Sequence, residues 1–277
     1  MRHLEGNFTD SDAMQLFYQC WLPDDEPRAV LAIVHGIGEH SGRYTNLVNH
    51  LVPRDIGVYA LDQRGHGQSP GKRGGLDNWG QFVGDVGEFV QMVRQENPGV
   101  PLFLMGHSMG GLIVASYLLD RQAGLQGAVL SSPLLEEANV SAFLKQMVKL
   151  LNRVRPGFAF DSGLDPKSIS RDPAEVQRYV DDPLVHSQVT VRLGSEMLRM
   201  LPLVHARAGQ ITLPLLIYHG EGDLLVPIGG SQRFHTEVGS SDRVFRSYPG
   251  GYHELHNDID RQRVLTDLHS WLERHID

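Results

Sequence analysis

The sequence has 277 residues, of which 41% are hydrophobic, and its formal net charge is −8. No apolar run approaches the roughly 18 residues that span a bilayer, so we expect a soluble protein. The acidic charge, with no basic cluster to offset it, argues against a nucleic-acid partner. The polar N-terminal segment lacks the apolar stretch of a signal peptide, and the single Cys20 allows no internal disulfide. We therefore expect a cytoplasmic location.

Short apolar runs rich in β-branched residues predict the buried strands of a parallel sheet. The first four, in chain order, are Ala29–His35, Gly57–Leu61, Leu102–Met105 and Gly127–Leu130. Apolar residues at helical spacing lie between several of them, over Asn46–Val52 and Phe82–Gln95. This alternation predicts an α/β fold with a mostly parallel central sheet flanked by helices.

The alternation stops after Pro133, because residues 136–210 show helical periodicity and no strand-like run. It resumes with a strand at Pro214–His219, a helix at Ser231–Val238, a strand at Val244–Tyr248 and a helix at Arg261–His275. The economical interpretation is a core formed by residues 1–135 and 211–277, with residues 136–210 inserted as a helical cap.

A serine between glycines, Ser108, lies in the run GHSMG at residues 106–110. The predicted strand Leu102–Met105 precedes it and the helix-like Gly111–Leu119 follows. A strand, a sharp turn and a helix are typical of a nucleophile elbow, which exposes a serine hydroxyl at the carboxyl edge of a sheet. An ordinary serine in a tight turn is the alternative.

A nucleophilic serine needs a histidine base, which a buried carboxylate orients. His253 follows the last predicted strand through a glycine-rich turn, and Asp223 follows the strand Pro214–His219. The resulting order Ser, Asp, His is the one expected of the α/β-hydrolase arrangement. Asp62, at the end of another strand, is a second candidate for the acid, although it would break this order.

The segment His35-Gly36-Ile37-Gly38 follows the first predicted strand. Such a loop can aim the N–H of Ile37 at a developing oxyanion, with the N–H of Met109 as its partner. A tight turn without a catalytic role is the alternative. Phosphate-loop, dinucleotide and HExxH zinc patterns do not match, so we expect no cofactor and no metal.

With these residues assembled, the chain resembles the monoacylglycerol lipases of the α/β-hydrolase superfamily, a group often labelled lysophospholipase-like. The resemblance spans nearly the whole chain. It rests on HGIGEHSGRY at 35–44, DQRGHGQS at 62–69, GHSMGG at 106–111, SRDPAEVQRYVDDPLV at 170–185, HGEGDLLVP at 219–227 and YPGGYHELHND at 248–258. The GEHSGRY extension and the segment around Tyr179 are the more specific parts.

The resemblance implies a triad of Ser108, Asp223 and His253, with an oxyanion hole formed by the N–H groups of Ile37 and Met109. It also implies a polar pocket for glycerol hydroxyls, made of Glu39, Arg43, Tyr179 and His256. An alternative is that Glu39 and Arg43 only pair with each other. The implied activity is hydrolysis of monoacylglycerol esters through an acyl-Ser108 intermediate.

The predicted cap also contains an amphipathic run. Its apolar residues are Val140, Phe143, Leu144, Met147, Val148, Leu151 and Val154, and its basic ones are Lys145, Lys149, Arg153 and Arg155. This pattern suits peripheral contact with an anionic membrane, although ordinary packing is the alternative.

The sequence leaves other functions open. The protein could instead be a broad carboxylesterase or lysophospholipase, or a ligand-sensing protein on the same fold. The sequence does not determine the oligomeric state.

Overall fold

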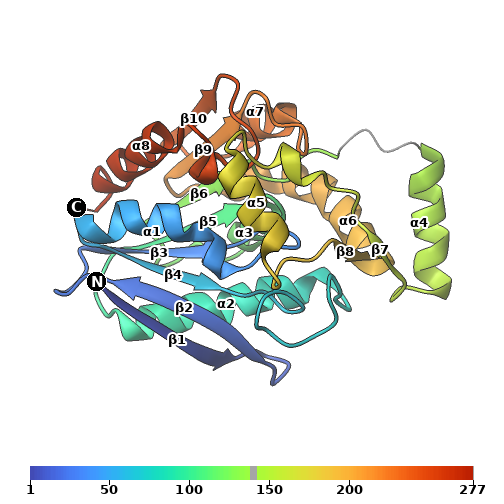
Figure 1. Cartoon of the computed structure of the whole chain (residues 1–277), viewed down its shortest axis with the longest axis horizontal. Coiled ribbons are helices and arrows are strands. Elements are labelled where there is room, and N and C mark those ends of the chain that lie inside the picture. Colours follow the sequence, from blue (N-terminus) through green and yellow to red (C-terminus); the bar gives the residue numbers. More distant parts are fainter. Residues whose placement is uncertain (138–141, 277) are drawn as a thin grey trace.

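The structure, a computed structural model, describes residues 1–137 and 142–276. Over these residues the chain forms one eight-stranded sheet in the order β1-β2-β4-β3-β5-β6-β9-β10 (Figure 1). Its strands are β1 (Arg2–Thr9), β2 (Gln15–Leu22), β3 (Ala29–Val34), β4 (Ile56–Leu61), β5 (Leu102–His107), β6 (Gly127–Ser131), β9 (Leu215–Gly220) and β10 (Arg243–Tyr248). From β4 to β10 the strands pair in parallel, whereas β1 and β2 are antiparallel at one edge.

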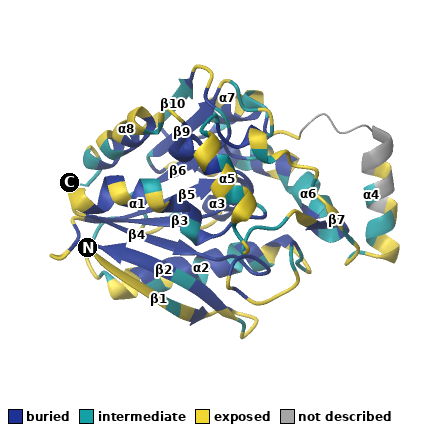
Figure 2. Cartoon of the chain, in the orientation of Figure 1, coloured by how far each residue is buried: buried dark blue, intermediate teal, exposed yellow. Residues whose placement is uncertain are grey.

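The central strands are apolar because both faces of the sheet are covered. In β3, Val30 belongs to one hydrophobic cluster and its neighbour Leu31 belongs to the other. Successive side chains of a strand point to opposite faces, so a strand buried on both sides needs an unbroken apolar run. Figure 2 shows these strands buried in the middle of the molecule.

The helices are α1 (Thr45–Leu51), α2 (Trp79–Glu96), α3 (Met109–Leu118), α4 (Ala142–Val154), α5 (Pro173–Asp181), α6 (Val191–Arg207), α7 (Ile228–Glu237) and α8 (Arg261–Glu273). Several of them cover the two faces of the sheet. Residues of α2, α3 and α6 pack into one cluster, and residues of α1 and α8 pack into the other. The predicted α/β architecture with a mostly parallel, helix-flanked sheet is therefore confirmed.

Two expectations were wrong. The strand at Ala29 is the third along the chain rather than the first, because the hairpin of β1 and β2 precedes it. The segment 136–210 also contains strands, since β7 (Ala159–Asp161) pairs with β8 (Gln188–Thr190). An exposed edge strand and three-residue strands carry too little hydrophobic pattern to be recognised.

The elements α4, β7, α5, β8 and α6 lie between β6 and β9 in the chain, and none of them joins the large sheet.

The predicted amphipathic run is described only in part. Its first residue, Val140, lies outside the described residues. The side chains of Phe143, Leu144, Lys145, Met147 and Lys149 also lie outside the described part of the chain. Among the described residues, no helix combines the length and apolar character needed to cross a bilayer.

The loop after β4 is fixed by Arg64, whose side chain is buried. Its Nη2 lies 2.8 Å from Asp10 in the turn between β1 and β2, and its Nε lies 2.7 Å from Asp85 of α2. Its Nη1 contacts Asp12 at 3.0 Å. One guanidinium therefore joins the N-terminal hairpin, the loop and α2, and it compensates two buried carboxylates.

We expect Arg64→Ala to lower the free energy of unfolding by about 3 to 5 kcal/mol, because it leaves buried carboxylates without their cation. Arg233→Ala is the matched control, since Arg233 pairs with Glu237 while its own side chain is 67% exposed. That exposed pair should contribute less than about 1 kcal/mol. Urea denaturation of both variants measures the difference, and equal small losses would contradict the assigned role.

Candidate active site

Ser108 sits at the sharp turn between β5 and α3. Its backbone has φ 52° and ψ −120°, a left-handed conformation that a residue other than glycine rarely adopts. A Cβ on Gly110 would collide with the carbonyl oxygens of Val34 and His35. The glycine therefore lets the first turn of α3 approach the end of β3, which forces the tight turn at Ser108.

His253 follows β10 and contacts Asp223, which follows β9. The His253 Nδ1 lies 2.7 Å from Asp223 Oδ2. Since Nδ1 is engaged by the carboxylate, Nε2 is the ring nitrogen that can exchange a proton with a serine hydroxyl. Ser108 and His253 line the same cavity, so the structure brings the three predicted residues to one place.

Asp223 is held as a carboxylate by several donors. The N–H groups of Leu225 and Val226 donate to its Oδ1 at 2.8 and 3.0 Å, and His219 Nε2 lies 3.1 Å from its Oδ2. Burial alone would raise its pKa, but the charge of His253 and the hydrogen bonds from His219 and His253 hold that pKa well below its usual range.

The pKa of His253 is raised by its partner. Burial opposes protonation of the ring, yet the charge of Asp223 and its hydrogen bond outweigh burial and raise the pKa of His253. This environment stabilises the imidazolium that a general base forms during the reaction.

The second candidate acid, Asp62, does not contact His253. It accepts hydrogen bonds from the N–H groups of Ser41 and Gln68, both at 2.7 Å.

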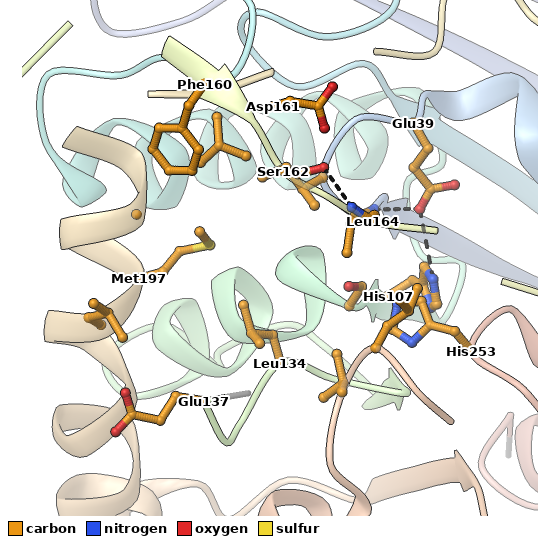
Figure 3. A pocket seen from close by; sticks show the side chains of 18 of the residues that line it. Glu39, His107, Leu134, Glu137, Phe160, Asp161, Ser162, Leu164, Met197 and His253 are labelled. Carbon is orange, nitrogen blue, oxygen red and sulfur yellow. Dashed lines mark hydrogen bonds and ion pairs between the residues drawn. The ribbon is translucent and has the colours of Figure 1, made fainter. Parts of the chain in front are cut away.

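The cavity at this site has a volume of about 830 Å³ (Figure 3). Ile37 lines it directly after β3. Met109 is the first residue of α3, so the helix itself has no acceptor for its N–H. Among the described residues, no three metal-ligating side chains come together to hold an ion.

Glu39 forms a polar part of the cavity wall. Its Oε1 accepts hydrogen bonds from the N–H of Gly36 at 2.6 Å and from the Tyr44 hydroxyl at 3.0 Å. Its Oε2 is buried and has no hydrogen-bond partner in the described part of the chain. Burial, together with the charge of Glu254, raises the pKa of Glu39 to about 8. The raised pKa favours the protonated carboxyl, which has a hydrogen to donate.

Arg43 pairs with Glu254 rather than with Glu39. Its Nη2 lies 2.9 Å from Glu254 Oε2, and both side chains are buried. The guanidinium also lies over the ring of Tyr179, 5.3 Å from its centroid. Glu39, Tyr179 and Glu254 line the cavity. Arg43 is not among the residues that line it, and it contacts Tyr179 and Glu254.

His256 is not among the residues that line the cavity. It is fully buried and stacks on Tyr44 with ring centroids 4.8 Å apart. Burial and the charge of Arg43 lower its pKa to about 3, so it is neutral.

Two residues of the site, Glu254 and His219, were not predicted from the sequence. Their positions, next to the predicted base and four residues before the predicted acid, were the available signals.

With this geometry in view, comparison with known proteins is informative. A family model described as "Serine aminopeptidase, S33" matches residues 25–260. The chain is 35% identical to the monoacylglycerol lipase of Mycolicibacterium smegmatis over 98% of both chains. It is 33% identical to human monoglyceride lipase, covering 97% of this chain and 90% of that protein. The chain belongs to the monoacylglycerol lipase family of α/β-hydrolases.

A solved structure of a family member supports this assignment. The crystal structure of Paleococcus ferrophilus monoacylglycerol lipase matches with a TM-score of 0.87 at 35% identity, covering 95% of this chain and 100% of that one. The fold is therefore the α/β-hydrolase fold. Membership also makes the chain an ester hydrolase by family.

Glu39→Gln tests the charge state of the cavity wall. Because the folded-state pKa of Glu39 is about 8 and an exposed Glu titrates near 4.3, the unfolded chain ionises first as pH rises. Wild type should therefore lose stability between about pH 4.3 and pH 8, relative to Glu39→Gln, by at most about 1.4 kcal/mol per pH unit.

Urea denaturation from pH 5 to pH 8.5 measures this difference. Glu5→Gln, on the exposed edge strand β1, is the matched control and should follow the wild-type curve. A stability difference between wild type and Glu39→Gln that stays constant with pH would show that Glu39 is already ionised at the low end.

Proposed function

We propose that this protein hydrolyses monoacylglycerols to a free fatty acid and glycerol. The observation that carries the proposal is the division of one cavity into two parts that meet beside Ser108 and His253. One part contains the carboxyl of Glu39, whose Oε2 has no hydrogen-bond partner among the described residues, together with Tyr179. The other part is lined mainly by apolar side chains, among them Met197 and Phe160.

The polar part suits a neutral diol. Glu254 is compensated by Arg43, and the raised pKa of Glu39 favours its neutral form, so neither favours a charged substrate. Hydroxyl groups both donate and accept hydrogen bonds, as the Glu39 carboxyl and the Tyr179 hydroxyl do. A choline or phosphate group would need an opposite charge here. The relatives named as monoacylglycerol lipases support the same substrate class.

The mechanism follows from the proposed roles of the triad. Ser108 Oγ attacks the ester carbonyl while His253 Nε2 takes its proton, and the N–H groups of Ile37 and Met109 stabilise the oxyanion. The tetrahedral intermediate expels glycerol, which receives the proton from His253. Water, deprotonated by His253, then attacks the acyl-Ser108 ester and releases the fatty acid. Asp223 keeps the imidazole in the required tautomer throughout.

Ser108→Ala should lower kcat by a factor on the order of 10⁶, by analogy with other triads, without unfolding the protein. Ser132→Ala is the matched control, because Ser132 is also a buried serine with positive φ and its Oγ has no hydrogen-bond partner among the described residues. It should retain wild-type activity.

The substrates in this experiment are a monoacylglycerol, a diacylglycerol, a triacylglycerol, a lysophospholipid and p-nitrophenyl butyrate. A monoacylglycerol preference that Ser108→Ala abolishes supports the proposal. Turnover of p-nitrophenyl butyrate alone would support a general esterase instead. Full activity of Ser108→Ala would overturn the assigned nucleophile.

We also propose that residues 136–210 act as a cap that contacts lipid surfaces. Leu150 and Val154, one turn apart on α4, are 58% and 70% exposed. Phe158 and Phe160 are 51% and 40% exposed and also line the cavity. Apolar side chains at the rim of a lipid-binding cavity would be covered when the rim rests on an acyl surface.

Replacing both Leu150 and Val154 by Glu should weaken binding to vesicles of mixed anionic lipids by about a hundredfold or more, since burying the two side chains contributes about 3 kcal/mol or more. Vesicle sedimentation measures binding. Leu4→Glu, on the edge strand β1, removes an exposed apolar side chain elsewhere and should leave binding unchanged. Hydrolysis of p-nitrophenyl butyrate in solution should stay within about twofold of wild type, and unchanged sedimentation of the double variant would contradict the proposed contact.

A further inference from the structure

Helix α6 presents one face to the cavity. The residues of this face that line it are Val191, Gly194, Met197, Leu198 and Leu201. They recur every three or four positions, as expected for side chains on one side of a helix. Four of the five carry apolar side chains, and Gly194 alone among them leaves a gap.

Neither the backbone nor the packing explains this glycine. Gly194 lies within α6 and is absent from the positive-φ glycines. A Cβ built on it would meet no atom within 4 Å in the described part of the chain. Gly110 is the contrast, because its Cβ would collide with two carbonyl oxygens. Since glycine weakens a helix relative to alanine, Gly194 costs stability without a packing benefit.

The gap opens into the apolar part of the cavity. In Figure 3, Met197 of the same helix face lies across the cavity from His253 and Glu39. The neighbouring helix α4, whose Asn152 Nδ2 lies 3.2 Å from Ser195 Oγ of α6, contributes Val148 and Leu151 to the wall. A chain that leaves the ester at Ser108 away from Glu39 would therefore run along this face of α6.

We propose that Gly194 sets the length of acyl chain that the cavity accepts. The absent side chain leaves room for the distal carbons of a long chain between α6 and α4. A side chain at this position would fill that room and exclude long chains, while short chains that end before it would still bind. The inference rests on the proposed function, since it assumes that the apolar part of the cavity holds the acyl group.

The experiment compares Gly194→Ala and Gly194→Leu with wild type on p-nitrophenyl butyrate, octanoate and palmitate, and on the monoacylglycerols of the same acids. Gly194→Leu should lower kcat/KM for palmitate by at least about tenfold, as expected for lost room in an apolar pocket, and leave butyrate within about twofold. Gly194→Ala should give a smaller loss in the same order. Its melting temperature should be equal to or above that of wild type, because alanine favours a helix.

Gly84→Ala is the matched control. Gly84 lies in α2, outside the cavity wall, and a Cβ there would make an ordinary contact with Ser11 at 3.5 Å. It should change stability without changing the preference for chain length. If Gly194→Leu fails to fold, Met197→Ala tests the same cavity by enlarging it, and should raise kcat/KM for palmitate relative to butyrate.

Equal losses for all chain lengths, or no loss for palmitate, would overturn the proposed role of Gly194. The head group is tested separately. If wild type cleaves the p-nitrophenyl esters but no monoacylglycerol, the proposed function fails, and the graded response of the Gly194 variants to chain length still decides whether this residue limits the acyl group.

Discussion

The ion pair between Arg43 and Glu254 joins the three chain segments that form the polar part of the cavity. Arg43 follows the loop after β3, and Glu254 is bonded in sequence to His253. The guanidinium also supports the ring of Tyr179 on α5. The N–H of Glu254 donates to the carbonyl of Ile169 at 2.8 Å, which ties the same loop to the segment before α5. Because the pair is buried, removing either partner would leave an uncompensated charge beside His253.

Arg43 lies near two buried carboxyl groups, those of Glu254 and Glu39. Its ion pair with Glu254 decides which of the two has the lower pKa. Glu254 accepts hydrogen bonds from Arg43 at 2.9 Å and from Asn257 at 2.8 Å, and these contacts keep its pKa low despite burial. Glu39 lacks such contacts on Oε2, and burial with the nearby charge of Glu254 raises its pKa. His107 packs against His253 with ring centroids 4.7 Å apart, and burial lowers its pKa so that it is neutral. His253, by contrast, has a raised pKa because the charge of Asp223 favours its protonated ring.

The sequence predicted those parts of the fold and site that depend on local pattern. The β-branched runs located each parallel strand, and GHSMG located the elbow, because its glycines are required by the close approach of α3 to β3. The hairpin of β1 and β2 was not found, since β1 is largely exposed and lacks alternation.

Partners within the site could not be read from sequence. Arg43 was weighed against Glu39, which lies four residues away, but it contacts Glu254, 211 residues along the chain. Long-range pairing of buried charges depends on which loops meet at the sheet edge, and no local pattern records it. For the same reason, the sequence placed His256 in the pocket, whereas in the structure it stacks on Tyr44 and is not among the residues that line the cavity.

The segment between β6 and β9 is attached to the core very unevenly. Near its middle, Arg171 donates from its backbone N–H and its Nε to Asp258, a fully buried residue after β10, both at 2.8 Å. Asp258 also accepts from the N–H of Tyr252, next to His253, at 2.9 Å. Tyr179 and Ile169 thus belong to a part of the segment that is bonded to the His253 loop, whereas α4 exposes Leu150 and Val154 to solvent. Charge-assisted bonds are geometrically demanding, so they fix the polar end of the cavity, while apolar contacts with α4 tolerate changes of shape. In the proposed function, selection of the head group and accommodation of the acyl chain therefore depend on different contacts of one segment, and each can change without disturbing the other.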